Sequence, residues 1–209
     1  MEVTPEQMLD DAYLDARARL IDMGRAQTPT FGMPRAGGTV YLTAADENGM
    51  MVSFIQSNYM GFGSGVVVPG TGISLQNRGV GFSMDARSAN VVAGGKRPFH
   101  TIIPAFLTKD GKPQMSFGVM GGDMQPQGHL QTLVRMLDYK QQPQAACDAP
   151  RWKVNRDFTL DVEATMNAGT VATLEARGHK LKSVTDPYMD FGSGQFIWRL
   201  SDDADHGYV

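Results

Sequence analysis

The chain has 209 residues, of which 42% are hydrophobic and 20% are charged, and its net charge is −3. This composition is typical of a globular protein with one core, and the mildly acidic balance argues against nucleic acid or an anionic membrane as a partner. A single cysteine excludes an intrachain disulfide, and the four histidines lack zinc-binding spacing, so we expect no metal and no cofactor. No apolar run approaches about 18 residues, so we expect no membrane span.

The N-terminal part is predicted to contain one helix and one loop. Residues 4–23 form the helix, with Thr4 as its N-cap, Pro5 at the first helical position, and an apolar stripe at four-residue spacing. Residues 27–38 contain two prolines and three glycines, which favour an exposed loop. Such a loop is where a chain is most easily cleaved.

The rest of the chain alternates between predicted strands and helices. Strands at residues 40–45 and 51–57 flank Asp46-Glu47-Asn48-Gly49, and strands at 102–108 and 114–119 flank Lys109-Asp110-Gly111, so both pairs are predicted hairpins. Helices are expected at about 127–140, 144–149 and 167–177, followed by strands at 181–184 and 195–200. The first of these helices is expected to turn its leucines inward: Leu130, Leu133 and Leu137, together with Val134. Hairpins beside separate helices predict an α+β fold or a layered αββα sandwich.

Gly37-Gly38-Thr39 stands directly before the first predicted strand. If the bond between Gly38 and Thr39 is cleaved, Thr39 carries both a hydroxyl nucleophile and, in its own α-amino group, a base. The same three residues also suit an ordinary turn that enters a strand, in which case Thr39 is a structural residue.

An ordered series of short motifs follows this point. The series is Gly38-Thr39, Ser57, Gly95-Lys96-Arg97-Pro98, Met120-Gly121-Gly122 and Ala149-Pro150-Arg151. It resembles the small, C-terminal subunit of the γ-glutamyltransferases, N-terminal-nucleophile hydrolases with a four-layer αββα fold that include cephalosporin-acylase-like members. The resemblance implies that residues 1–38 are the tail of the large subunit. It also implies that residues 39–209 are the catalytic portion of the small subunit, with about half of the sandwich and an incomplete C-terminus.

The resemblance assigns catalytic roles to four residues. Thr39 would be the nucleophile, freed by autocatalytic cleavage after Gly38, and Ser57 the hydroxyl that hydrogen-bonds to it. The backbone N–H groups of Gly121 and Gly122 would form the oxyanion hole for a γ-glutamyl or related acyl amide, which passes through an acyl-enzyme. Alternatively, the two glycines form a plain turn and the protein is a catalytically silent structural or binding member of the same fold.

Substrate recognition departs from the transpeptidase pattern at four candidate substrate-binding positions. Tyr59 replaces an asparagine, Arg78 a glutamine, and His100 and Thr101 a pair of serines; Gly81 replaces an acidic residue nearby. The lost carboxylate removes the partner of a substrate ammonium group, and Arg78 would repel that group. The resemblance is therefore greater to the cephalosporin-acylase-like branch than to the glutathione transpeptidases.

The resemblance also implies partners. These are the large subunit of the same precursor and a small acyl amide substrate, with a dimer of heterodimers as a further expectation. Because half of the sandwich would lie outside this chain, we expect wide apolar faces to be exposed. The cellular location stays open: a cytoplasmic location is slightly favoured, and members of the family can be exported.

Overall fold

The computed structural model describes residues 10–20, 39–186, 191–201 and 207–209. Its helical elements are α2 (Asp11–Ala18), η1 (Arg78–Gly81), η2 (Gly122–Met124), α3 (Gln125–Leu133), the π-helical turn η3 (Val134–Asp138), α4 (Pro143–Asp148) and α5 (Ala168–Ala176). Its strands are β1 (Thr39–Ala45), β2 (Met51–Ser57), β3 (Ala105–Lys109), β4 (Lys112–Val119), β5 (Trp152–Val154), β6 (Leu160–Glu163), β7 (Leu181–Val184) and β8 (Gly194–Trp198).

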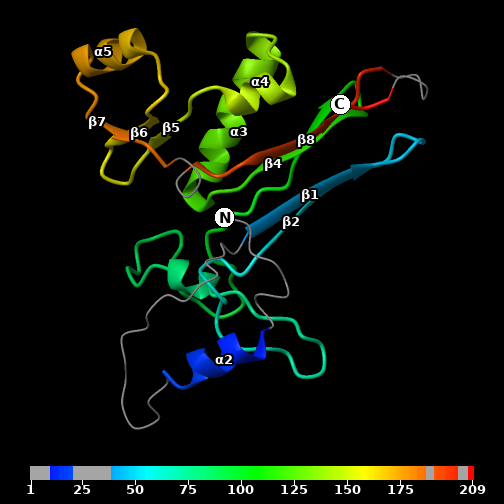
Figure 1. The fold of residues 1–209 in the computed structure, drawn as a ribbon, viewed down its shortest axis with the longest axis vertical. Coiled ribbons are helices and arrows are strands. Elements are labelled where there is room, and N and C mark those ends of the chain that lie inside the picture. The colour runs from blue at the N-terminus through cyan, green and yellow to red at the C-terminus, as the bar shows by residue number, and fades with distance from the viewer. Residues whose placement is uncertain (1–9, 21–38, 187–190, 202–206) are drawn as a thin grey trace.

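The main body consists of three layers (Figure 1). Helices α3 and α4 cover one face of the antiparallel sheet β3-β4-β8, and the hairpin β1-β2 lies on the opposite face. The core between helices and sheet contains Met115 and Phe117 of β4, which pack against Met136 and Ala146. Phe117 also stacks on Phe196 of β8, with ring centroids 6.0 Å apart. Strand β4 is therefore central, and its C-terminal half is buried on both faces.

The face of β4 opposite the helices is built from small residues that admit the hairpin. Tyr41 of β1 lies over Gly118, where an added Cβ would stand only 2.4 Å from the ring. The Tyr41 hydroxyl bonds to Ser53 at 2.8 Å, and the Thr43 hydroxyl bonds to Ser116. A glycine at position 118 is thus required by the close approach of the two sheets.

The other face of the hairpin is exposed and apolar. Val40, Leu42, Val52 and Phe54 are each 45–52% exposed. Leu42 pairs directly with Phe54 across the two strands, so these side chains gather on one surface. The expectation of an exposed apolar face is confirmed for this part of the chain.

A second unit contains β5, β6, β7 and α5, and it was only partly predicted. Strand β6 pairs antiparallel with β5 and parallel with β7, and α5 connects the two parallel strands. Strands β5 and β6 were not predicted, because β6 reads Leu-Asp-Val-Glu, with two acidic residues in four. Both acids are buried beside cations: Asp161 lies 3.8 Å from Lys153, and Glu163 lies 2.7 Å from Arg151. Tertiary ion pairs therefore make a buried strand from a polar sequence.

Helix α2 differs from the helix predicted at residues 4–23. It begins after Asp10, whose extended backbone marks the N-terminal end of the helix. The Asp10 carboxylate caps this end by accepting a hydrogen bond from the Tyr13 amide at 2.7 Å. It ends at Ala18, and it buries no residue. The predicted cap, Thr4 with Pro5, lies outside the described residues. The side-chain cap at Asp10 competes successfully with continued helix, as capping residues do.

The helix predicted at residues 127–140 is correct in place and only partly correct in orientation, because Leu133 packs against the core as predicted whereas Leu130 and Leu137 do not. It is divided into α3 and the π-helical turn η3, and Leu130 and Leu137 lie on its exposed side. The buried side presents His129, Gln131 and Thr132 instead. These polar residues are inside because they bond to strand backbones: Gln131, for example, donates to and accepts from the main chain of Trp152.

The remaining predicted strands and helices agree with the structure within a few residues, and the loop predicted at residues 27–38 lies outside the described residues. Asp110 and Gly111 both have positive φ, as the tight hairpin turn between β3 and β4 requires. Asn167 caps α5 through its side chain, and Gly178, with φ of 91°, follows the end of that helix as predicted. Within the described part of the chain, no helix has the length and apolar character needed to cross a lipid bilayer.

Candidate active site

Thr39 and Ser57 meet at the open end of the β1-β2 hairpin. They are paired in the strand register, and their hydroxyl oxygens lie 2.8 Å apart. Ser57 Oγ also accepts a hydrogen bond from the Tyr59 amide at 2.9 Å. Ser57 Oγ is therefore held by both Thr39 and the Tyr59 amide, which fixes its hydroxyl within hydrogen-bond distance of the Thr39 hydroxyl. Gly38 lies outside the described residues.

The contacts between the two sheets bring this end of β1 to the end of β4. Thr43 meets Ser116, and two residues earlier Tyr41 meets Gly118. If this register continues for two more residues, Thr39 is level with Met120, the residue before Gly121 and Gly122.

Gly121 and Gly122 form a turn that only glycine adopts easily. Their φ angles are 124° and 57°, and a Cβ on Gly121 would lie 3.2 Å from that of Met124. Among the described residues, neither backbone N–H finds an acceptor. Two neighbouring N–H groups without acceptors, at the N-terminal side of η2 and α3, form a site that favours negative charge.

A neighbouring turn, at Gly192 and Ser193, packs against the residues of the glycine pair. The Met120 amide donates to Ser193 O at 3.0 Å, and a Cβ on Gly192 would collide with Met120 O at 1.8 Å. Arg151 holds this turn, since its guanidinium donates to the carbonyl oxygens of Phe191 and Gly192 at 3.0 and 2.6 Å. The Ala149-Pro150-Arg151 motif therefore supports the Gly121 turn through Arg151.

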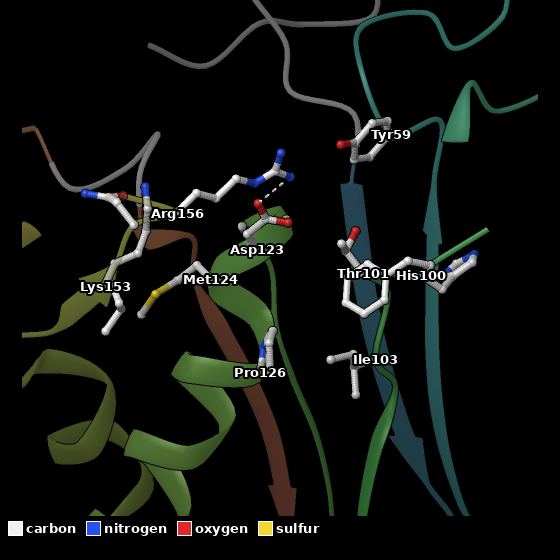
Figure 2. A pocket seen from close by; sticks show the side chains of 14 residues that line it. Tyr59, His100, Thr101, Ile103, Asp123, Met124, Pro126, Lys153 and Arg156 are labelled. Atoms are coloured by element: carbon white, nitrogen blue, oxygen red, sulfur yellow. Dashed lines mark hydrogen bonds and ion pairs between the residues drawn. The ribbon is translucent and has the colours of Figure 1, made fainter. Parts of the chain in front are cut away.

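A pocket of about 860 Å³ opens beside the glycine pair (Figure 2). One side carries Tyr59, His100 and Thr101, and the opposite side carries Asp123, Lys153 and Arg156. Three of the four predicted substrate-binding residues therefore line one pocket with Gly121 and Gly122. Asp123 and Arg156 form an exposed ion pair of 3.2 Å across the second side.

The fourth predicted substrate-binding residue, Arg78, lies behind the pocket wall. Its side chain is buried, its Nη1 donates to the Thr101 hydroxyl at 2.7 Å, and its guanidinium lies 4.8 Å from the centre of the Tyr59 ring. Burial lowers the pKa of Arg78 below its ordinary value. Burial also lowers the pKa of His100, and the charges of Arg78 and then Arg97 lower it further, so His100 is neutral at neutral pH.

Tyr59 adopts a backbone conformation that is unusual for a residue with a side chain. Its φ is 74°, and its amide is the one that bonds to Ser57. Positive φ at a bulky residue costs of order 1 kcal/mol or more and is concentrated at functional sites. The strained turn links the hydroxyl pair to the pocket wall.

His129 was not among the predicted site residues, and it supports the strand that carries the site. Its ring is 7% exposed, and its Nε2 accepts a hydrogen bond from the Val119 amide at 2.9 Å. Burial lowers its pKa to about 4, which keeps the ring neutral and able to accept. No local sequence signal marks this role, because it depends on the packing of His129 against β4, which is set by the tertiary structure.

The pocket residues Asp123, Lys153 and Arg156 were also missed by sequence reasoning. Asp123 follows Gly122 directly in the sequence, and Lys153 and Arg156 follow Arg151 closely, so proximity to the two motifs was the available signal.

Lys96, in the Gly95-Lys96-Arg97-Pro98 motif, donates hydrogen bonds to the carbonyl oxygens of Ala89 and Val91 and so stabilises its own loop. Among the described residues, no group of three His, Cys, Asp or Glu side chains could hold a metal.

The sequence model of the γ-glutamyltranspeptidase family matches residues 1–208. The chain belongs to this family. Among curated members, it is 38% identical over 190 residues to a glutathione hydrolase-like proenzyme, YwrD, of Bacillus subtilis, and 37% identical over 191 residues to an oxamate amidohydrolase proenzyme of Klebsiella pneumoniae. These matches cover 88% and 89% of this chain and 36% of each relative.

A solved structure shows the same fold. The crystal structure of a cephalosporin acylase from Bacillus halodurans superposes with a TM-score of 0.74 at 51% identity, covering all of this chain and 37% of that one. The expected fold class, that of the N-terminal-nucleophile hydrolases, is thus confirmed. The chain spans about a third of the length of these relatives.

Proposed function

We propose that this γ-glutamyltranspeptidase family member carries the catalytic centre of an acyl amide hydrolase or acyltransferase, with Thr39 as its nucleophile. Two relatives of this chain are named as a glutathione hydrolase-like proenzyme and an oxamate amidohydrolase proenzyme. The substrate class proposed is γ-glutamyl or related acyl amides. The observation that carries the proposal is the 2.8 Å contact between the Thr39 and Ser57 hydroxyls. The contacts of Thr43 with Ser116 and of Tyr41 with Gly118 direct this end of β1 toward the end of β4, which supports a site shared with Gly121-Gly122.

The proposed reaction begins with cleavage of the Gly38–Thr39 bond, which frees the α-amino group of Thr39. An α-amine of pKa about 7.7–8.0 can accept the hydroxyl proton near neutral pH. The Thr39 oxygen then attacks the acyl carbonyl, and the carbonyl oxygen becomes negative within reach of the Gly121 and Gly122 N–H groups. One such donor is worth about 2.7–4 kcal/mol of transition-state stabilisation.

The intermediate collapses when the amine leaves with a proton, which yields an ester between the acyl group and Thr39. Water or an acceptor amine then attacks this ester, and Thr39 recovers its hydroxyl proton. Ser57 suits a supporting role throughout. Its oxygen accepts from the Tyr59 amide, so its own proton is available to the Thr39 oxygen when that oxygen is left without one.

The proposed partner is the large-subunit region of the same precursor. The apolar outer face of β1-β2, with Val40, Leu42 and Phe54 about half exposed, supports this partner because exposed patches of this kind are interaction surfaces. A dimer of heterodimers stays a prediction.

The test uses the complete protein, with its large-subunit region. Mass spectrometry after expression should find a chain that begins at Thr39, and Thr39→Ala should leave the precursor uncleaved, whereas Thr39→Ser should cleave. Thr108→Ala, at an exposed threonine of β3, is the matched control and should cleave normally. Cleavage of Thr39→Ala at the wild-type rate would refute the proposal.

The alternative is a catalytically silent member of the fold. It would be supported by a precursor that stays intact and by the absence of Thr39 labelling with an electrophilic amide analogue. In the active enzyme, Ser57→Ala should slow turnover about tenfold while cleavage still yields Thr39, since one hydrogen bond to a reacting oxygen is lost.

A further inference from the structure

Helix α3 turns two hydrogen-bond acceptors toward the neighbouring ends of β3 and β4. Gln125 and His129 lie one turn apart on its inward side, and they are 1% and 7% exposed. Gln125 Oε1 accepts from the Ile103 amide and His129 Nε2 from the Val119 amide, each at 2.9 Å. Buried polar side chains are costly unless they are bonded, so these two bonds fix where α3 packs against the sheet.

The two bonds take the place of further strand pairing. Strands β3 and β4 are paired as far as Ala105 and Phe117. Two residues further in the same register, Ile103 would stand opposite Val119, yet β3 begins only at Ala105. The Ile103 and Val119 amides donate to side chains of α3 instead of pairing with each other. Helix α3 therefore ends the pairing of the two strands and supplies the acceptors that their amides need.

The pocket opens where the two strands separate. Ile103 lines one side of it, and Pro126 of α3 lies across from Ile103 (Figure 2). The glycine pair Gly121-Gly122 lines the same pocket and directly precedes α3 through the short helix η2. The position of α3 thus determines both the width of the pocket and the place of the glycine pair in it.

The backbone that enters Gly121-Gly122 is held from two sides. The Val119 amide donates to His129, and the next amide, that of Met120, donates to Ser193 O at 3.0 Å. Successive amides of an extended strand point in opposite directions, so the two bonds hold the end of β4 at both of its edges. The bond to His129 is the one made by a side chain, so a substitution can remove it alone.

We propose that His129 is a positioning residue for the acyl transfer, because its bond to Val119 sets where the Gly121 and Gly122 N–H groups meet the oxyanion. This inference rests on the proposed function of the same site. Donors of an oxyanion hole must come within about 2.7–3.1 Å of the oxyanion, so a small displacement of the strand end weakens their bonds. These bonds are stronger in the transition state than in the bound ground state, so their loss lowers kcat more than it changes KM.

The bond also defines which substitutions are informative. A ring nitrogen that accepts a hydrogen bond carries no proton, so the His129 ring is neutral with its proton on Nδ1. A glutamine amide extends to the place of Nε2, whereas an asparagine amide extends only to that of Nδ1. His129→Gln therefore keeps an acceptor within reach of Val119, and His129→Asn and His129→Leu remove it.

The test is hydrolysis of γ-glutamyl and glutaryl p-nitroanilides by the complete, cleaved protein. The rate of p-nitroaniline release is divided by the amount of Thr39 that an electrophilic acyl analogue labels to completion, so unfolded or uncleaved molecules do not count. His129→Leu and His129→Asn should each lower this kcat at least about tenfold, less than the 10²–10³ lost when a donor is removed outright, with KM changed less than about threefold. His129→Gln should keep kcat within about threefold of the wild type.

Met136→Ala is the matched control for a loss of stability. It removes a buried side chain from the core behind β4, through packing alone. Its kcat per labelled Thr39 should stay within about twofold of the wild type. If His129 had only a structural role, His129→Leu would behave in the same way, with fewer active molecules and an unchanged kcat.

Two results would overturn the inference. One is a loss of kcat smaller than about tenfold in His129→Asn, which also decides the matter if His129→Leu yields no cleaved protein. The other is an equal loss in His129→Gln and His129→Asn, since the acceptor would then be irrelevant.

Failure of the proposed function looks different. If the wild type cleaves neither anilide and Thr39 is not acylated, the proposed function is wrong and the inference falls with it. If the wild type cleaves them through Thr39 and kcat is insensitive to His129, the proposed function stands and only the role of His129 is wrong.

Discussion

His129 should make the stability of this protein fall as the pH is lowered from about 6.5 to about 4. The folded ring accepts a hydrogen bond from the Val119 amide and lies edge-on to Phe117, with ring centroids 5.1 Å apart. Its folded pKa of about 4 lies below the ordinary value of 6.5. In this window the unfolded chain binds a proton that the folded chain does not, so unfolding becomes easier as pH falls.

The magnitude follows from the pKa difference. At 1.36 kcal/mol per pKa unit, a fall from 6.5 to about 4 corresponds to about 3 kcal/mol of stability, fully present above pH 6.5 and lost by about pH 4. His129→Gln is the informative variant, because the amide oxygen of glutamine can take the place of Nε2 as acceptor but cannot titrate.

The assay is urea-induced unfolding of the wild type and the variant at several pH values. The wild-type free energy of unfolding should fall more steeply than that of His129→Gln, by up to about 1.4 kcal/mol per pH unit between pH 6.5 and 4. His179→Gln changes an exposed histidine and should leave the wild-type slope unchanged. Parallel slopes for wild type and His129→Gln would refute the reasoning.

Three further substitutions test the packing around the site. Gly118→Ala places a Cβ 2.4 Å from a ring carbon of Tyr41 and should lower the free energy of unfolding by about 1–3 kcal/mol, measured by denaturant titration. Arg151→Met leaves Glu163 buried without its cation and should lower the free energy of unfolding by about 3–5 kcal/mol. The double variant with Glu163→Gln should recover part of this loss in the same titration. If it recovers none of the loss, the proposed stabilising pair is contradicted. In the complete protein, Phe54→Ser should lower the melting temperature by several degrees if the large-subunit region covers β1-β2, whereas the control Phe158→Ser, at an 85% exposed site, should not.

Much of the fold near the site was predictable because its signals are local. The hairpin β1-β2 has an Asn-Gly turn between two alternating strands, and its bounds were predicted within one residue. Asn167 and Gly178 mark the two ends of α5 by their side-chain and backbone preferences. Such features need only neighbouring residues, so they are visible in the sequence.

The errors have a common physical cause, which is burial of polar groups by distant partners. The acidic residues Asp161 and Glu163 are not typical of a buried strand in the sequence pattern. In the structure β6 is buried because Lys153 pairs with Asp161 and Arg151 pairs with Glu163. The inward side of α3 was predicted from its leucines, of which only Leu133 packs against the core. Most of that side carries His129 and Gln131, which bond to strand backbones elsewhere in the sequence. Periodicity identifies a helix but not which of two faces finds partners.

By itself, the sequence determined the candidate residues and their chemistry: a threonine that opens a strand, a second hydroxyl at Ser57, and the glycine pair Gly121-Gly122. These choices depend on residue type and short spacing, so they needed no coordinates. Only the tertiary structure decided that Tyr59, His100 and Thr101 share one pocket with those glycines, and that Arg78 lies behind it as a buried charge. Burial and charge balance depend on what surrounds a side chain in space, which a linear sequence does not contain.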